Sequence, residues 1–89
     1  MKDRRGKFKI SLDVINENPW LVLKVMAKVI IVRAECMFML DAIEYQGYSP
    51  EFAKVPEALE TPEYAIEVET LKDGDGYIVD YGIKFPEGM

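Results

Sequence analysis

The sequence contains no histidine, a single cysteine and only two serines. Histidine is the commonest general base and a frequent metal ligand, so its absence removes the ordinary means of acid–base catalysis and of metal binding. Ser11 and Ser49 have no histidine to activate them. Cys36 lies in an apolar run, where a thiol is more often a core residue than a nucleophile. We therefore expect a protein that is not an enzyme and that has no catalytic, cofactor-binding or metal-binding residues.

The sequence also lacks a long uncharged apolar segment. Its most apolar stretch, residues 19–40, is interrupted by four charged side chains, whereas a membrane span needs roughly 20 nearly uncharged residues. The basic start of the chain leads into alternating residues and not into the apolar run of a secretory signal. One cysteine cannot form an intrachain disulfide, which is typical of a reducing compartment. These features predict a cytoplasmic protein with no membrane partner.

Charge is plentiful but unevenly placed along the 89 residues, which we expect to form one small domain, residues 1–89. The net charge of −5 divides into +4 for residues 1–9, −2 for residues 10–49 and −7 for residues 50–89. Either the basic start and the acidic end lie side by side in the fold and partly neutralise each other, or the acidic half presents a face to a basic partner. The overall acidity opposes attraction to phosphate, so we expect no nucleic-acid partner.

The first half of the chain predicts a strand followed by a helix. Residues 7–14 alternate between apolar and polar side chains, which is typical of a half-buried strand. Asn18 is a good helix N-cap, and Pro19 at the first helical position loses no hydrogen bond there, so a helix should begin at this point.

The end of this helix is open to two interpretations. In the first, which we prefer, the helix stops near residues 33–36 and residues 37–48 form a second strand. In the second, the helix continues to Tyr45, and Gly47 supplies a left-handed C-terminal cap. The longer helix would measure about 40 Å at a rise of 1.5 Å per residue, which is too long for a compact body of this size.

The second half predicts a β-hairpin. Residues 63–69 and 77–85 alternate in the manner of strands, and Asp73-Gly74-Asp75-Gly76 between them is typical of a turn because Gly and Asp accept positive φ. The expected fold is α+β, one helix packed on a mostly antiparallel sheet in the order β-α-β-β-β, or β-α-β-β if the helix is long. Residues 71–78 resemble the centre of an EF-hand calcium loop, but the first and last acidic ligands of that pattern are missing, which favours the turn.

Aromatic and acidic residues of the second half have a composition common in protein interfaces. The candidate interface residues are Tyr45, Tyr48, Phe52, Glu63, Glu67 and Glu69. The apolar residues near the middle of the chain exceed what one helix and a thin sheet can cover, which indicates a homodimer. We expect a protein-binding module or inhibitor that acts through an acidic, tyrosine-rich surface, a composition frequent among accessory proteins of phages and mobile elements. The alternative is a homo-oligomeric structural or assembly protein without catalytic activity.

Overall fold

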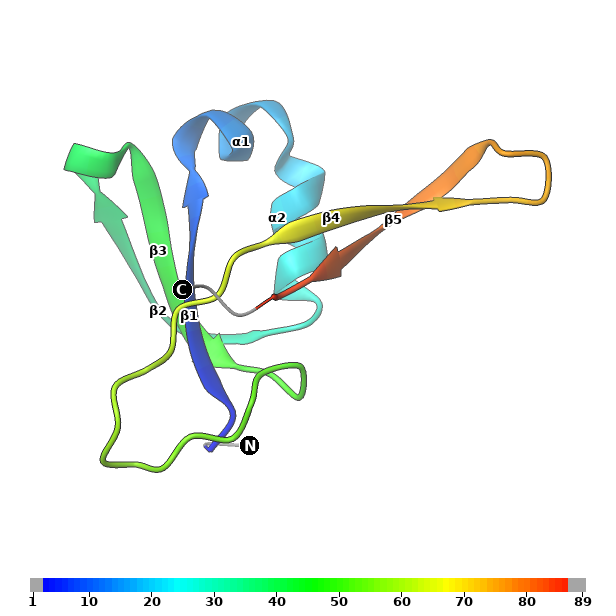
Figure 1. Cartoon of the computed structure of the whole chain (residues 1–89). Coiled ribbons are helices and arrows are strands. Elements are labelled where there is room, and N and C mark those ends of the chain that lie inside the picture. The colour runs from blue at the N-terminus through cyan, green and yellow to red at the C-terminus, as the bar shows by residue number, and fades with distance from the viewer. Residues whose placement is uncertain (1–2, 87–89) are drawn as a thin grey trace.

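The computed structural model describes residues 3–86 and has an α+β fold, as the sequence predicts (Figure 1). Its elements are, in order, β1 (Arg5–Ser11), α1 (Leu12–Glu17), α2 (Pro19–Met26), β2 (Ile30–Met37), the 3-10 turn η1 (Phe38–Leu40), β3 (Ala42–Tyr48), β4 (Glu67–Lys72) and β5 (Ile78–Lys84). The order follows the expected β-α-β-β-β outline, with a short additional helix, α1, before the expected one and one additional strand.

The first strand is shorter than the alternating pattern predicts. We expected it to continue to Val14, but β1 ends at Ser11 because the Ser11 hydroxyl accepts a hydrogen bond from the amide of Val14 (3.2 Å) and caps helix α1. The helix then breaks at Asn18, since Pro19 has no N–H to donate to the preceding turn. Helix α2 begins at Pro19 as predicted, although the Asn18 side chain makes no capping hydrogen bond.

Both predictions for the end of this helix are wrong, because α2 already ends at Met26. The β-branched residues that follow, which restrict side-chain freedom in a helix, start strand β2 instead. The second strand expected over residues 37–48 begins as the last residue of β2, turns at η1 and Asp41, and returns as β3. Asp41 adopts a left-handed conformation (φ 52°), which lets the chain reverse within a few residues.

Strand β3 is the centre of a three-stranded antiparallel sheet in the order β1-β3-β2. Side chains from α2, β1, β3 and the base of the β4–β5 hairpin form one buried cluster on one face of this sheet. The largest fully buried side chains are Phe8, Phe52, Ile83 and Val25. The segment after β3 wraps beneath the start of β1, where the amide of Ser49 donates to the carbonyl of Arg4 (3.0 Å).

The predicted hairpin is confirmed, with β4 and β5 paired antiparallel on either side of the Asp73–Gly76 turn. Its strands form a separate two-stranded sheet that projects from the body (Figure 1). The molecule consequently measures 49 × 29 × 22 Å, with a radius of gyration of 14.1 Å. A compact chain of this length has a radius of gyration of about 12 Å. The hairpin is thus an arm that the body does not cover.

A substitution at Gly47 can test how closely β2 packs against β3. A Cβ at this position would lie 2.3 Å from the carbonyl oxygen of Ile30 and 2.8 Å from a methyl group of Val29. We expect Gly47→Ala to lower the free energy of unfolding by about 1–3 kcal/mol, because a backbone atom cannot yield as a side chain can. Urea denaturation provides the measurement.

Gly74→Ala is the matched control, because a Cβ at Gly74 meets nothing within 4 Å. Its free energy of unfolding should stay within about 0.5 kcal/mol of the wild type. Equal losses in the two variants would contradict the close approach of β2 to Gly47.

Candidate functional site

Two of the six candidate interface residues lie in the core. Tyr45 is 8% exposed, with its ring stacked on Phe8 at a centroid distance of 5.6 Å, and burial raises the pKa of its hydroxyl. Phe52 is fully buried and stacks on Tyr64 at 4.6 Å. In the folded chain these two rings are therefore covered, because the register of β3 and the turn after it point them inward.

Three of the remaining candidates are exposed acidic residues, but the fold does not bring them all together. Glu63 lies beside β1, where its carboxylate pairs with the Lys9 ammonium at 2.5 Å. Glu67 and Glu69 lie on β4, and Glu69 pairs with Lys84 of β5 at 3.3 Å. The sixth candidate, Tyr48, is half-buried at the end of β3. The acidic, tyrosine-rich surface predicted from the sequence is thus divided between the body and the hairpin.

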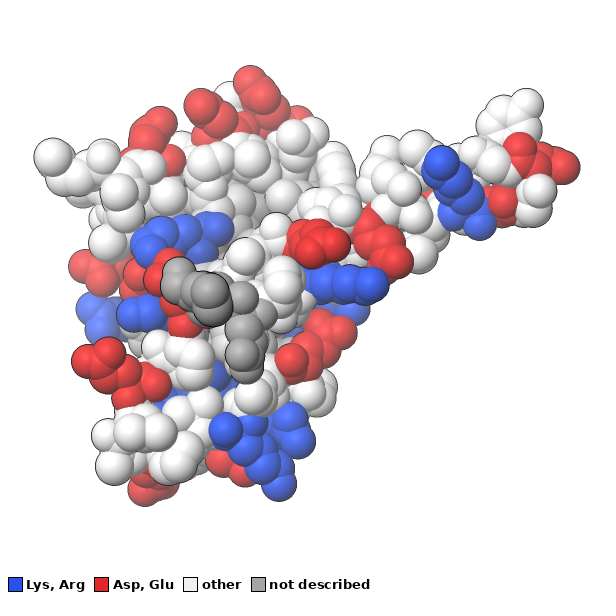
Figure 2. Space-filling model, in the orientation of Figure 1, with Lys and Arg blue, Asp and Glu red and all other residues white. Residues whose placement is uncertain are grey.

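The basic start of the chain lies beside the acidic second half, as the first of the two interpretations of the charge pattern predicted. Besides its pair with Glu63, Lys9 lies 3.9 Å from Glu44, and the Arg5 guanidinium donates to the carbonyl of Val55 (3.1 Å). Lys2, which contributes to the basic start, lies outside the described residues. Figure 2 shows acidic and basic side chains next to one another over the lower body and on the hairpin. Only the end that contains α1 is acidic without basic neighbours in this view.

The acidic and cysteine side chains of the described residues were compared with the arrangement that a metal ion needs. Residues 3–86 contain no group of three or more acidic or cysteine side chains placed to hold a metal ion. In the segment that resembles a calcium loop, the Asp73 carboxylate accepts hydrogen bonds from the amides of Asp75 (2.9 Å) and Tyr77 (3.0 Å). It therefore stabilises the hairpin turn, as the sequence predicted.

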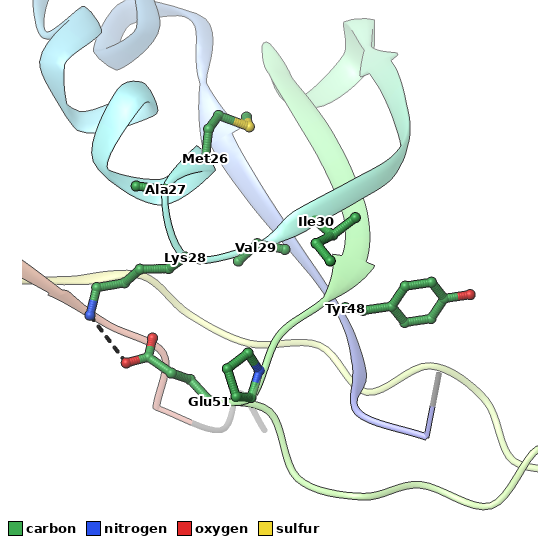
Figure 3. A pocket seen from close by; sticks show the side chains of 8 residues that line it. Met26, Ala27, Lys28, Val29, Ile30, Tyr48 and Glu51 are labelled. Atoms are coloured by element: carbon green, nitrogen blue, oxygen red, sulfur yellow. Dashed lines mark hydrogen bonds and ion pairs between the residues drawn. The ribbon is translucent and has the colours of Figure 1, made fainter. Parts of the chain in front are cut away.

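An open cavity of about 410 Å³ lies where α2 passes into β2 (Figure 3). Met26, Val29 and Ile30 line it with apolar surface, Tyr48 flanks it, and the Lys28–Glu51 ion pair (3.1 Å) borders it on the other side. A lining of this composition holds apolar groups and has few polar atoms to orient a reacting substrate.

The outer half of the hairpin carries exposed apolar side chains. Tyr77 is 72% exposed and Val79 63% exposed, and Ile78 and Leu71 are exposed as well. The signal was available, because residues 77–79 are three consecutive apolar residues and so place apolar side chains on both faces of the strand. Alternation alone does not tell how far a strand extends beyond the body that would cover it.

A second uncovered apolar region lies at β2 and η1. Ile30 and Val32 are more than half exposed, and Phe38 and Met39 are 86% and 97% exposed. Monomeric proteins expose single apolar residues routinely, but neighbouring ones mark contact surfaces. The apolar residues that the sequence has in excess in this part of the chain are therefore exposed on the surface.

Comparison with known proteins gives no further guide. No protein-family model, no curated protein and no solved structure matches the chain. Within residues 3–86, no helix combines the length and the apolar character that crossing a bilayer requires. Two surfaces of the structure are candidate contact sites, namely the projecting hairpin and the uncovered β2–η1 region.

The Lys9–Glu63 pair makes stability depend on pH in one direction. The side-chain hydrogen bond from Lys9 holds the pKa of Glu63 below its usual value of 4.5. The pair therefore stabilises the fold fully above that value, and its contribution is lost as the pH falls through the lowered pKa. We expect Glu63→Gln to unfold more easily than the wild type at neutral pH, by less than about 1 kcal/mol because both side chains are partly exposed.

This difference should shrink as urea denaturation is repeated at successively lower pH, because the wild-type carboxyl becomes protonated as the pH falls through its lowered pKa. Lys9→Gln should show the same pH dependence, because it removes the other half of the pair. A difference that persists undiminished at the acidic end would contradict the role of the ion pair.

Proposed function

We propose that the chain is a protein-binding module or inhibitor without catalytic activity, and that the β4–β5 hairpin is its binding element. The observation that carries this proposal is the projection of an apolar and acidic arm from a body that leaves its outer half uncovered. Hairpin residues 67–84 carry five acidic and two basic side chains, a net charge of −3. Such an arm fits a groove with apolar pockets and a basic rim.

The hairpin is attached to the body through its second strand. The ring of Tyr81 packs on Trp20 at a centroid distance of 4.7 Å, and the Asp80 carboxylate accepts a hydrogen bond from the Lys24 ammonium. Both contacts join β5 to α2, so the base of the arm is held while its tip stays open. An element fixed in this way loses less conformational freedom on binding than a flexible loop does.

The proposed setting is the cytoplasm. Cys36 is free and exposed on β2, and an exposed thiol persists in a reducing compartment. A small acidic module of this kind fits the accessory proteins that phages and mobile elements encode, which act by occupying a protein of the host. The tyrosine of the proposed surface is Tyr77, and Glu67 and Glu69 remain its acidic residues, whereas the buried Tyr45 and Phe52 belong to the core.

The test is affinity capture with the immobilised chain from a lysate of the organism that encodes it, followed by measurement of the dissociation constant for the captured protein. We expect Tyr77→Ala/Val79→Ala to weaken this binding at least tenfold, because exposed aromatic side chains dominate interfaces. Glu67→Lys/Glu69→Lys should weaken it as well, and the loss should shrink as the salt concentration rises.

Leu59→Ala is the matched control, since Leu59 is an exposed apolar side chain on the connection below the sheet, away from the hairpin. It should bind as the wild type does. A partner that binds the hairpin variants and the wild type with equal affinity would refute the hairpin as the binding element.

A second candidate function is that of a homo-oligomeric structural or assembly protein. The exposed β2–η1 region favours it, because an apolar region beside a sheet edge is what a dimer of two identical chains buries. Sedimentation at micromolar concentration should then give the mass of two 10.2 kDa chains, and the thermal midpoint should rise with protein concentration. A monomer throughout that range would exclude this function.

A further inference from the structure

The two edges of the three-stranded sheet differ in how they are covered. At the β1 edge, the Lys7 amide donates to the carbonyl of Pro62 (2.9 Å) and the Tyr64 amide donates to the carbonyl of Lys7 (2.8 Å), so residues 62–64 protect that strand. Strand β2 pairs with β3 on one side, and no described segment pairs with its other side. An unpaired strand of eight residues is a template for another strand.

Two acidic side chains face each other across β2 and β3. Glu35 lies directly opposite Glu44 of β3, and like charges in opposed positions destabilise a sheet. Lys9 approaches Glu44 from the other side at 3.9 Å, and among the described residues Glu35 pairs with Arg33 of its own strand, at 3.2 Å. Both members of this pair are more than half exposed. A positively charged side chain beyond the β2 edge, opposite Glu35, would offset the repulsion between Glu35 and Glu44.

We propose that a second copy of the chain occupies this edge, with β2 paired antiparallel to its counterpart about a two-fold axis at Ala34. The β3 partners of β2 run from Tyr48, opposite Ile30, to Ala42, opposite Met37, and Tyr45, opposite Ala34, lies midway. Val32 falls in the bulge and has no β3 partner. With Val32 outside this ladder as well, a two-fold axis at Ala34 pairs every other residue of β2 with a residue of the second copy. This arrangement gives the longest possible ladder.

The same register is the one that matches the charges. It places Arg33 of each copy opposite Glu35 of the other, twice by symmetry. A register centred on Arg33 would oppose two arginines, and one centred on Glu35 would oppose two glutamates. The remaining pairs are apolar or small, with Ile31 opposite Cys36 and Ile30 opposite Met37 of the other copy. Complete overlap of the strands and charge complementarity select the same arrangement.

The ends of β2 are also complementary to each other. The cavity of about 410 Å³ lies at the start of β2, and the exposed side chains of Phe38 and Met39 lie at its far end, on η1. A two-fold axis at the middle of the strand exchanges these ends, so η1 of each copy comes next to Val29 and Ile30 of the other. The apolar turn and the apolar cavity of the two copies then cover each other, and the two sheets become one of six strands.

This inference rests on the second candidate function and assigns its interface, so its test begins with the mass. At a concentration where the wild type sediments as a dimer, we expect Arg33→Glu and Glu35→Arg each to raise the dimer dissociation constant about tenfold or more, because each reverses two symmetric pairs. The combined variant Arg33→Glu/Glu35→Arg exchanges the charges and should restore most of the affinity. An unfolded variant could not give that restoration.

A cross-link tests the register independently. In Ala34→Cys/Cys36→Ser, the introduced thiols of the two copies face each other and should form an intermolecular disulfide under mild oxidation. The wild type is the first control, because its two Cys36 thiols would be four strand positions apart, roughly 14 Å, which is beyond disulfide reach. Thr70→Cys/Cys36→Ser, with an exposed thiol on the hairpin, is the second, and neither control should cross-link at a comparable rate.

The outcomes separate the inference from the function on which it rests. A monomer at micromolar concentration would overturn both. A dimer that tolerates the charge reversals and fails to cross-link at position 34 would overturn the β2 interface while leaving an oligomeric function in place. Loss of dimer in the single charge variants, recovery in the exchanged variant and a cross-link at position 34 together would establish the register.

Discussion

The main constraint on this structure is that few elements are available to cover the apolar face of its three-stranded sheet. Helix α2 has eight residues, about 12 Å at 1.5 Å per residue, and it packs over β1 and β3 together with the base of the hairpin. Strand β2 lies beyond this cover, so even Ala34 and Cys36, which pair with inward-facing positions of β3, stay exposed.

The small number of covering elements also explains why the hairpin projects from the body. One core cluster takes Ile83 and Phe85 from the end of β5, and Trp20 and Lys24 of α2 hold the next residues of that strand. Beyond this point, no further helix or strand of residues 3–86 covers β4 and β5. The two proposed contact surfaces thus have one origin, which is a core large enough to fold the body and too small to enclose every apolar strand.

Much of the fold could be predicted from the sequence where local rules act. The alternation of β1, the Pro19 start of α2 and the Asp73–Gly76 turn were all correct, because each depends on neighbouring residues alone. The end of α2 could not be predicted in this way, since residues 29–32 fit either a buried helix or a strand until their neighbours are known. The missed strand β2 follows from that one ambiguity.

The candidate site was harder to predict, because it depends on which face of a strand the body covers. Tyr45 and Tyr48 lie on the same strand, yet the first is buried against Phe8 and the second lines a surface cavity. Glu67 and Glu69 were predicted to lie on a contact surface and are exposed, whereas the alternation of residues 77–85 does not show that the body ends before Tyr77. Exposure at a hairpin tip is a property of the whole fold.

We propose that the surfaces left uncovered by this small core are where the chain meets other chains. Hydrogen–deuterium exchange at two protein concentrations tests it most directly, because unpaired amides exchange quickly and paired ones slowly. We expect the backbone amides of β2 and η1 to become protected from exchange as the protein concentration rises. The amides of the outer hairpin should stay exchangeable until a foreign partner is added. Exchange in β2 that is the same at both concentrations would contradict it.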